Sequence, residues 1–344
     1  MKKSVAITIH RLSISQFRRF RENHTFEFTT PNEGSGFTSV TGMNESGKTT
    51  IVDALRLCLY GKLEFDYPQP YVTHELVDNL EVGETESAEL SVILSDGNGA
   101  QYRVNRTVRT VMTPRGAEND IKDASVETTE DGEWTRNPDY SAKEILNRTL
   151  PEVLEPVIFH NGETSLGIKE EWVESIGVTE LAEIVEEVSQ NYPDTVKTQA
   201  KERFSTRKKT IETLLNAANS LFSEMTFRGE AYLSLDSEDD QPKVKIVQED
   251  GSEYLPSAGE QMITSMSFLL AFAEILPVTP PLVLDGVLGR ADRETRERML
   301  KQLSAAAEDG QVILMSIPYS IQDLPEFEVS EGNKIELEPP DLAQ

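Results

Sequence analysis

Apolar and polar positions alternate with a period of two along the first part of the chain. This spacing predicts strands with one buried face over residues 5–9, 12–17, 25–28 and 37–40. The last of them runs into a glycine-containing loop, after which apolar positions recur every three to four residues. This second period predicts an amphipathic helix over residues 49–60, with Ile51, Leu55 and Leu59 on one face.

The middle of the chain changes character twice. Residues 88–112 alternate like a β-hairpin, whereas residues 113–138 are polar and turn-rich, which predicts an exposed loop with a small strand at Val126. From residue 169 to 225 the pattern is helical, with a break at Tyr192-Pro193. Sustained heptads are lacking in that stretch, so we expect no long coiled coil.

The last part of the chain alternates strands and helices again. We expect strands over residues 231–235, 243–247, 282–284 and 311–316, and helices over residues 260–275 and 293–308. The tail beyond residue 338 is expected to fray. These patterns predict an N-terminal lobe (residues 1–168), a short helical insert (169–227) and a C-terminal lobe (228–344).

Composition limits the class of protein. A chain of 344 residues is long enough for one large α/β domain or two modest ones. It contains no run of eighteen apolar residues, and its start reads as a strand rather than a signal peptide, so we expect a cytoplasmic protein with no membrane partner. The single cysteine, Cys58, excludes an internal disulfide and a cysteine-based zinc site, and its apolar neighbours predict a buried thiol.

The formal net charge of −27 bears on the partner. Such a surface repels nucleic acid over most of its area, so either the partner is not DNA or the protein works in a high-salt cytoplasm. The even spread of acidic residues favours the halophilic interpretation. Two groups of basic residues are the best candidates for contacts with a DNA backbone: Lys201, Arg203, Arg207, Lys208 and Lys209, and Arg103, Arg106 and Arg109. Ion pairs with nearby glutamates are the alternative role for these residues.

The strongest motif is Gly42-Met43-Asn44-Glu45-Ser46-Gly47-Lys48-Thr49, a complete Walker A sequence between a predicted strand and a predicted helix. Backbone N–H groups of such a loop surround the β-phosphate of a nucleotide. Lys48 is expected to reach the β- and γ-phosphates, and the Thr49 hydroxyl to bind Mg²⁺. The candidate nucleotide-binding residues of this segment are Gly42, Asn44, Glu45, Ser46, Gly47, Lys48, Thr49 and Thr50.

Two further segments extend this site. The buried strand before Asp285 ends in that aspartate, which is the Walker B pattern and predicts a ligand for Mg²⁺; a turn or helix-capping aspartate is the alternative. Upstream, Ser257-Ala258-Gly259-Glu260 precedes a predicted helix and resembles the ABC signature, in which a serine and helix-start amides bind the γ-phosphate of nucleotide held by the other protomer. An ordinary helix N-cap is the alternative there.

Several segments together resemble the Rad50, RecF and SMC family of ABC ATPases. They are the N-terminal stretch from Ile14 to Phe20 with Arg18 and Arg19, the helix segment from Asp53 to Gly61, and the Q-loop-like stretch from Ile158 to Glu163, in which Asn161 takes the glutamine position. The stretch from Asp285 to Asp292 is most similar to the Walker B and D-loop of the DndD ATPases of DNA sulfur modification.

This resemblance implies an α/β fold, a P-loop NTPase of ABC type with a mixed sheet, an antiparallel β-subdomain and a short helical insert in place of a coiled coil. It also implies an ATPase that dimerises on Mg-ATP and acts in DNA repair, DNA sulfur modification or defence against foreign DNA, with a nuclease or DNA-modifying protein as possible partner. Lys48, Asp285 and Asn161 are the implied catalytic residues, and Thr49, Asn161 and Asp285 the implied Mg²⁺ ligands. Further nucleotide contacts are implied for Arg18, Arg19, Ser257, Gly259, Glu260 and Asp292.

The chain departs from the family pattern in chemistry as well as length. Gly286 stands where a glutamate usually activates water, and glycine accepts no proton. Only Ser316 is found where a switch histidine is expected, and the coiled-coil arms are missing. Slow hydrolysis is therefore expected, and a non-hydrolysing, ATP-gated scaffold that recruits a nuclease or DNA-modifying partner is the alternative. A transporter subunit and a P-loop kinase fit the motifs less well.

Overall fold

The protein is described by a computed structural model. Its described residues are 6–63, 70–96, 98–130, 133–136, 141–161, 207–226, 231–236, 243–276, 278–289, 291–318 and 333–339. Predicted features that lie outside these ranges include the break at Tyr192-Pro193, Lys201, Arg203 and the end of the tail.

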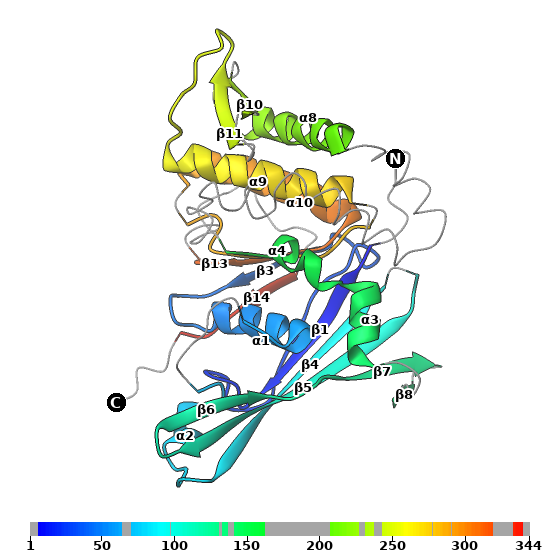
Figure 1. Cartoon of the computed structure of the whole chain (residues 1–344), viewed down its shortest axis with the longest axis vertical. Helices are drawn as coiled ribbons and strands as arrows, with labels where there is room; N and C mark the ends of the chain where they lie inside the picture. Colours follow the sequence, from blue (N-terminus) through cyan, green and yellow to red (C-terminus); the bar gives the residue numbers. More distant parts are fainter. Residues whose placement is uncertain are drawn as a thin grey trace.

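A parallel five-stranded sheet forms the centre of the fold. Its strand order is β14-β3-β13-β12-β9, and every neighbouring pair is parallel. The helix α1 lies on one side of this sheet, and α9 and α10 lie on the other (Figure 1). The bounds of these elements are β3 (Phe37–Thr41), β9 (Phe159–Asn161), β12 (Leu282–Asp285), β13 (Val312–Ser316), β14 (Asn333–Glu336), α1 (Lys48–Tyr60), α9 (Ala258–Ile275) and α10 (Arg293–Asp309).

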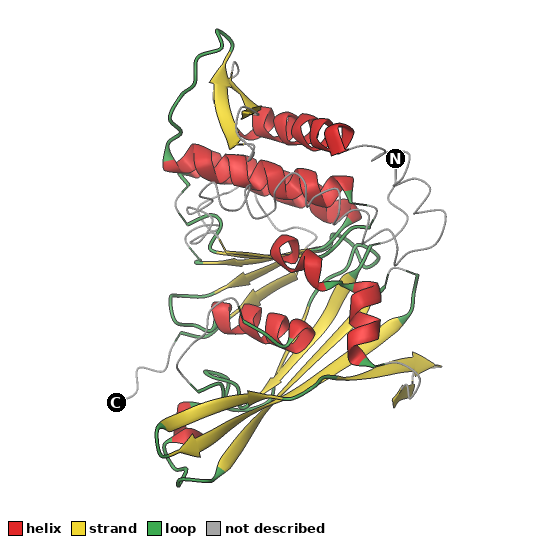
Figure 2. Cartoon of the chain, viewed as in Figure 1, coloured by secondary structure: helices red, strands yellow, loops and turns green. Residues whose placement is uncertain are grey.

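A second, antiparallel sheet of seven strands packs against the other side of α1 (Figure 2). Its order is β2-β1-β4-β5-β7-β8, with β6 also paired to β5. Because α1 lies between two sheets, every residue from Ile51 to Leu59 is buried, as expected of a helix enclosed on all sides. The strands are β1 (Thr8–Ser15), β2 (His24–Glu27), β4 (Thr85–Ser95), β5 (Gln101–Thr113), β6 (Gly116–Ile121), β7 (Ser125–Glu130) and β8 (Glu133–Arg136).

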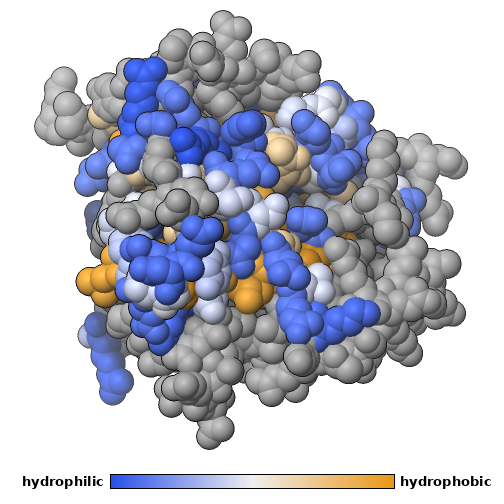
Figure 3. Space-filling view, turned by 90° about the horizontal axis from the view of Figure 1, so that it is seen from above, coloured by the Kyte–Doolittle hydropathy of each residue, from blue (hydrophilic) through white to orange (hydrophobic). Residues whose placement is uncertain are grey.

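A third layer covers the parallel sheet on the side of α9 and α10. The helix α8 (Arg207–Met225) packs on both of them through Leu214, Ala218, Phe222 and Met225, which recur at helical spacing. The hairpin of β10 (Ala231–Asp236) and β11 (Lys243–Gln248) adjoins α8. Seen from above, the described part of this face is mostly hydrophilic, with smaller hydrophobic areas between (Figure 3). Short helices complete the described elements: α2 (His74–Val77), α3 (Ala142–Thr149), η1 (Glu152–Leu154) and α4 (Glu155–Ile158).

Most elements predicted from the sequence are confirmed, and the fold class is confirmed with its parallel and antiparallel strands in separate sheets. The first two predicted strands are instead one strand, β1, in which the register with β4 shifts between Ile9 and Arg11. Such a bulge interrupts the alternation of buried residues without ending the strand. The three domain boundaries stay a prediction. Among the described residues, no helix is both long enough and apolar enough to cross a bilayer.

The predicted exposed loop over residues 113–138 is wrong. Three strands, β6, β7 and β8, occupy most of it and extend the antiparallel sheet at β5. The predicted small strand at Val126 is confirmed as part of β7, where Val126 is buried in the core. Apolar side chains are few in these three strands, and backbone pairing determines their conformation. The strand β14 was not predicted either, because only its pairing with β3 defines it.

Replacing Phe222 with alanine should cost about 3–5 kcal/mol of the free energy of unfolding, because the ring is 1% exposed between α8 and α9. The matched control is Ser223→Ala on the exposed side of the same helix, which should change stability by less than about 0.5 kcal/mol. Urea unfolding of both variants checks this. Equal stability of the two variants would mean that α8 is not part of the folded core.

Candidate nucleotide-binding site

The loop between β3 and α1 has a tightly curled backbone. Gly47 has φ 103°, and a Cβ there would lie 2.9 Å from the Phe20 ring. A Cβ at Gly42 would overlap the Ser46 hydroxyl. Glu45 also adopts a positive φ of 65°, which is uncommon for a residue with a side chain. The close approach of Ser46 at Gly42, and the positive φ together with the nearby Phe20 ring at Gly47, therefore favour glycine at both positions.

The segment from Phe17 to Phe20 braces this loop. The Arg19 guanidinium donates to the Glu45 carbonyl, and the Phe20 ring lies against Gly47. Arg18 instead forms an ion pair with Asp53 of α1 and lies near the rings of Phe17 and Tyr71. Burial raises the pKa of the Asp53 carboxyl, and the Arg18 charge opposes that shift. Of the two arginines predicted to contact nucleotide, Arg19 is thus placed at the loop, whereas Arg18 is engaged by Asp53.

Polar side chains converge where the loop meets the end of β12. The Thr49 hydroxyl donates to Asp285 Oδ2 at 2.8 Å, although the two residues are 236 positions apart. The parallel register of β9 with β12 pairs Asn161 with Asp285, so these residues also lie side by side. Lys48 Nζ donates to the carbonyls of Gly42 (2.6 Å) and Met43 (2.7 Å), and burial lowers its pKa.

This arrangement fits a magnesium nucleotide. Hydroxyl, carboxylate and amide oxygens are the ligands that Mg²⁺ prefers, and it binds through few protein groups plus phosphates. No cluster of three or more histidine, cysteine, aspartate or glutamate side chains that could hold a metal ion occurs among the described residues, so phosphate oxygens would have to complete the coordination of Mg²⁺ here. Within the described structure the Ser46 hydroxyl is buried in the loop without a hydrogen-bond partner, as expected of a group that faces a ligand.

The signature-like segment lies at the start of α9, across the parallel sheet from α1 (Figure 1). Ser257 caps this helix: its hydroxyl accepts from Glu260 N (3.4 Å), while Glu260 Oε2 accepts from Ser257 Oγ (2.6 Å) and N (2.9 Å). A Cβ added at Gly259 would meet no atom within 4 Å. The N-cap, named above as the alternative to an ABC signature, is therefore present, and the helix start is open. Asp292, in the D-loop-like segment, caps α10 by accepting from Thr295 N at 2.9 Å.

Gly286 and Ser316 are the two positions at which this chain lacks the glutamate and the histidine of the family pattern. Gly286 has φ 68°, a conformation that disfavours the usual glutamate. Ser316 ends β13, and its carbonyl accepts from Gly42 N at 3.2 Å, so it adjoins the P-loop. Its hydroxyl is buried and has no hydrogen-bond partner in the described part of the chain. The sequence showed Ser316 only as the residue that replaces the expected switch histidine. Its position at the end of a predicted buried strand was the one sign that it lies near the P-loop.

The predicted basic contacts on β5 are partly engaged within the chain. Arg106 donates to the carbonyls of Cys58 (3.0 Å) and Lys122 (2.8 Å), and Arg103 pairs with Glu127 at 3.1 Å. Arg109 is exposed, so it is the member of this group best placed to contact a DNA backbone. The side chains of Arg207 and Lys208 on α8 lie outside the described residues, and Lys209 on the same helix is exposed.

Comparison with known proteins identifies a matching family and several relatives. A family model described as an AAA domain matches residues 11–257. Over 98 residues the chain is 33% identical to one of the subunits of the nuclease SbcCD, SbcC, of Bacillus subtilis (strain 168), a stretch that covers 28% of this chain and 8% of that protein. An Smc head bound to the C-winged helix domain of ScpA is similar with a TM-score of 0.61 at 15% identity, covering 90% of this chain and 89% of that chain.

A second Smc head domain, with an extended coiled coil and bound to the C-terminal domain of ScpA derived from Pyrococcus furiosus, gives a TM-score of 0.58 at 14% identity, covering 92% of this chain and 91% of that chain. At these identities the likeness shows the fold alone, and it confirms the predicted fold class.

The Cys58 thiol offers a test of the packing of α1. It is fully buried, and burial raises its pKa to about 12. We expect Ellman's reagent to leave the native protein unmodified up to pH 9.0, the ordinary thiol pKa, and to label one thiol per chain in urea. Absorbance of the released thiolate measures both. Rapid stoichiometric labelling of the native protein would contradict the enclosure of α1 between the two sheets.

Proposed function

The chain belongs to the AAA domain family, and on that basis we propose a Rad50/SMC-like ATPase that binds Mg-ATP, closes as a homodimer and acts in DNA metabolism. The observation that carries the proposal is the hydrogen bond from Thr49 to Asp285 at the mouth of the P-loop. It joins the Walker A helix to the end of a parallel strand, and nucleotides bind at such strand ends in α/β sheets.

Each group at this edge has a chemical task in the proposal. Lys48 exchanges its two loop carbonyls for phosphate oxygens, which are stronger acceptors because they are charged. Thr49, Asp285 and Asn161 hold Mg²⁺, whose charge offsets that of the phosphates. Arg19 fixes the loop through the Glu45 carbonyl, which keeps the loop N–H groups directed at the nucleotide.

The second copy completes the site in this proposal. Ser257 and Gly259 stand at an open helix start on the far side of the sheet from α1, so they suit the nucleotide of a partner. Two exposed apolar side chains flank the two halves: Met43 in the P-loop is 44% exposed and Leu255 before the signature is 92% exposed. A partner that closes over both segments would cover these two side chains.

A role beside a DNA-processing partner is proposed from the relatives. One of them is a subunit of a nuclease, and its matched stretch is similar to part of this chain. The DndD-like residues from Asp285 to Asp292 favour DNA sulfur modification over general repair or defence. The net charge of −27 makes binding to DNA strongly dependent on salt and on a few basic side chains such as Arg109.

An ATP-gated scaffold without turnover is the second candidate, and Gly286 favours it. With φ 68°, this position accommodates glycine, whereas a glutamate there would cost about 1–2 kcal/mol of backbone strain. The turn therefore favours glycine over the usual water-activating glutamate at this position. In this alternative, ATP binding closes the dimer and recruits the partner, and release rather than hydrolysis reopens it.

Equilibrium binding of a fluorescent ATP analogue with Mg²⁺ tests the proposed site. Lys48→Ala should weaken binding about 10- to 100-fold, because it removes charged hydrogen bonds to phosphate. Lys122→Ala is the matched control, since Lys122 directly follows β6 of the antiparallel sheet and pairs with Asp120. Equal affinity of both variants, or a wild-type protein that binds no nucleotide, would refute the proposed function.

Phosphate release in high-salt buffer separates the two candidates. The ATPase proposal predicts turnover that duplex DNA stimulates and Lys48→Ala abolishes. Tight ATP binding with no turnover above background would establish the scaffold instead.

A further inference from the structure

A row of buried charges runs along α1 behind the P-loop. Asp53 and Arg56, one turn apart on this helix, are 4% and 6% exposed, and Glu155 at the start of α4 is 8% exposed. Buried ion pairs contribute little net stability because each charge loses its hydration, so these charges point to a role other than stability. The predicted chemistry assigned no role to Arg56 or Glu155.

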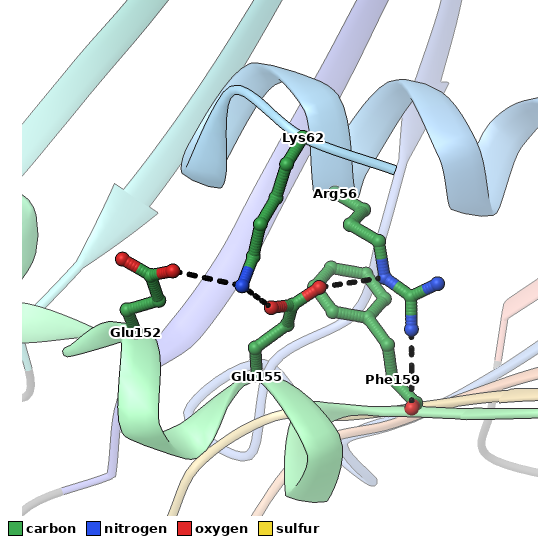
Figure 4. A network of polar contacts seen from close by, with 5 residues as sticks. All are labelled: Arg56, Lys62, Glu152, Glu155 and Phe159. Atoms are coloured by element: carbon green, nitrogen blue, oxygen red, sulfur yellow. Dashed lines mark hydrogen bonds and ion pairs between the residues drawn. The ribbon is translucent and has the colours of Figure 1, made fainter. Parts of the chain in front are cut away.

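Arg56 makes three different contacts with the chain segment that ends in Asn161 (Figure 4). Its Nε pairs with Glu155 Oε1 at 3.2 Å, and its Nη2 donates to the Phe159 carbonyl at 3.4 Å. The guanidinium carbon lies 5.1 Å from the centre of the Phe159 ring. The planar guanidinium suits an ion pair with a carboxylate, a hydrogen bond to a carbonyl and a contact with an aromatic ring together. Lys62 holds the other oxygen of Glu155 at 2.6 Å.

These contacts connect the two parts of the candidate Mg²⁺ site, α1 with Thr49 and the strand ends with Asn161 and Asp285. Phe159 begins β9, an end strand of the parallel sheet, and Asn161 ends it beside Asp285. Asp285 accepts from Thr49 at 2.8 Å. Thr49 and Arg56 are seven residues apart on α1, about two turns, and so lie on one face of the helix. One face of α1 therefore contacts both Phe159, through Arg56, and Asp285, through Thr49. Asn161 lies between these two contacts.

We propose that Arg56, oriented by Glu155, is a positioning residue that fixes β9 against α1 and so sets where Asn161 stands relative to Thr49 and Asp285. The Mg²⁺ affinity of the nucleotide site then depends on a side chain that touches neither metal nor nucleotide. The inference rests on the proposed function, because it presupposes that these residues hold Mg²⁺ with ATP. Groups that orient metal ligands in this way commonly alter metal affinity when they are replaced.

Arg56→Lys is the direct test, because it keeps the charge and removes the fork of donors. The binding of a fluorescent ATP analogue is titrated with Mg²⁺, and thermal unfolding is recorded alongside. We expect the half-saturating Mg²⁺ concentration to rise about tenfold, with binding in EDTA unchanged. Arg11→Lys is the matched control, an arginine–carboxylate pair with Glu27 on the antiparallel sheet, and its Mg²⁺ titration should match that of the wild type.

A double variant separates the effect of Arg56 on Mg²⁺ binding from its effect on folding stability. It also replaces Arg56→Lys as the test if that variant does not fold. Arg56→Met with Glu155→Leu removes both buried charges, which should restore folding stability without restoring the bond to the Phe159 carbonyl. The proposal predicts normal unfolding with a Mg²⁺ requirement that stays raised. A wild-type Mg²⁺ requirement in either folded variant overturns this inference alone. A wild-type protein that binds no nucleotide overturns the proposed function as well.

Discussion

The parallel register of β3, β13, β12 and β9 is the constraint on which the candidate site depends. Parallel strands end at the same edge of a sheet, so residues far apart in the sequence meet there. Pairing of β13 with β3 brings Ser316 to the P-loop, and pairing of β9 with β12 brings Asn161 to Asp285. A shift of one residue in either pair would turn these side chains to the opposite face. The strand register therefore brings the site residues together.

The helix α1 connects this edge to the rest of the molecule. It lies between the two sheets, and its polar groups are held by partners from separate segments: Asp53 by Arg18 near the N-terminus, and Arg56 by Glu155 before β9. Ion pairs of this kind contribute little net stability but are directional. They fix the orientation of α1 about its axis, which apolar packing on all sides does not. The position of Thr49 at its N-terminal end follows from that orientation.

The sequence predicted the parts of the site that are encoded locally. The Walker A loop, Asp285 at the end of its strand and the cap at Ser257 each depend on a few consecutive residues. Contacts made across the fold escaped prediction: the ion pair of Arg18 with Asp53 joins two segments that sequence patterns do not place side by side. A nucleotide contact of Arg18 stays a prediction. The strands β6 and β8 escaped prediction because they carry too few apolar residues to show a period, although their backbone pairing is regular. The small strand at Val126, part of β7, was predicted.

The central claim is that Thr49, Asp285 and Asn161 form a divalent metal site shared with the phosphates of a nucleotide. Electron paramagnetic resonance of the protein with Mn²⁺ in place of Mg²⁺ tests it most directly, because hyperfine couplings identify the nuclei that touch the metal. The account predicts couplings to phosphorus when ATP is added, and their loss in Asp285→Asn. Phosphorus couplings that persist unchanged in Asp285→Asn, or protein-bound Mn²⁺ without any, would contradict it.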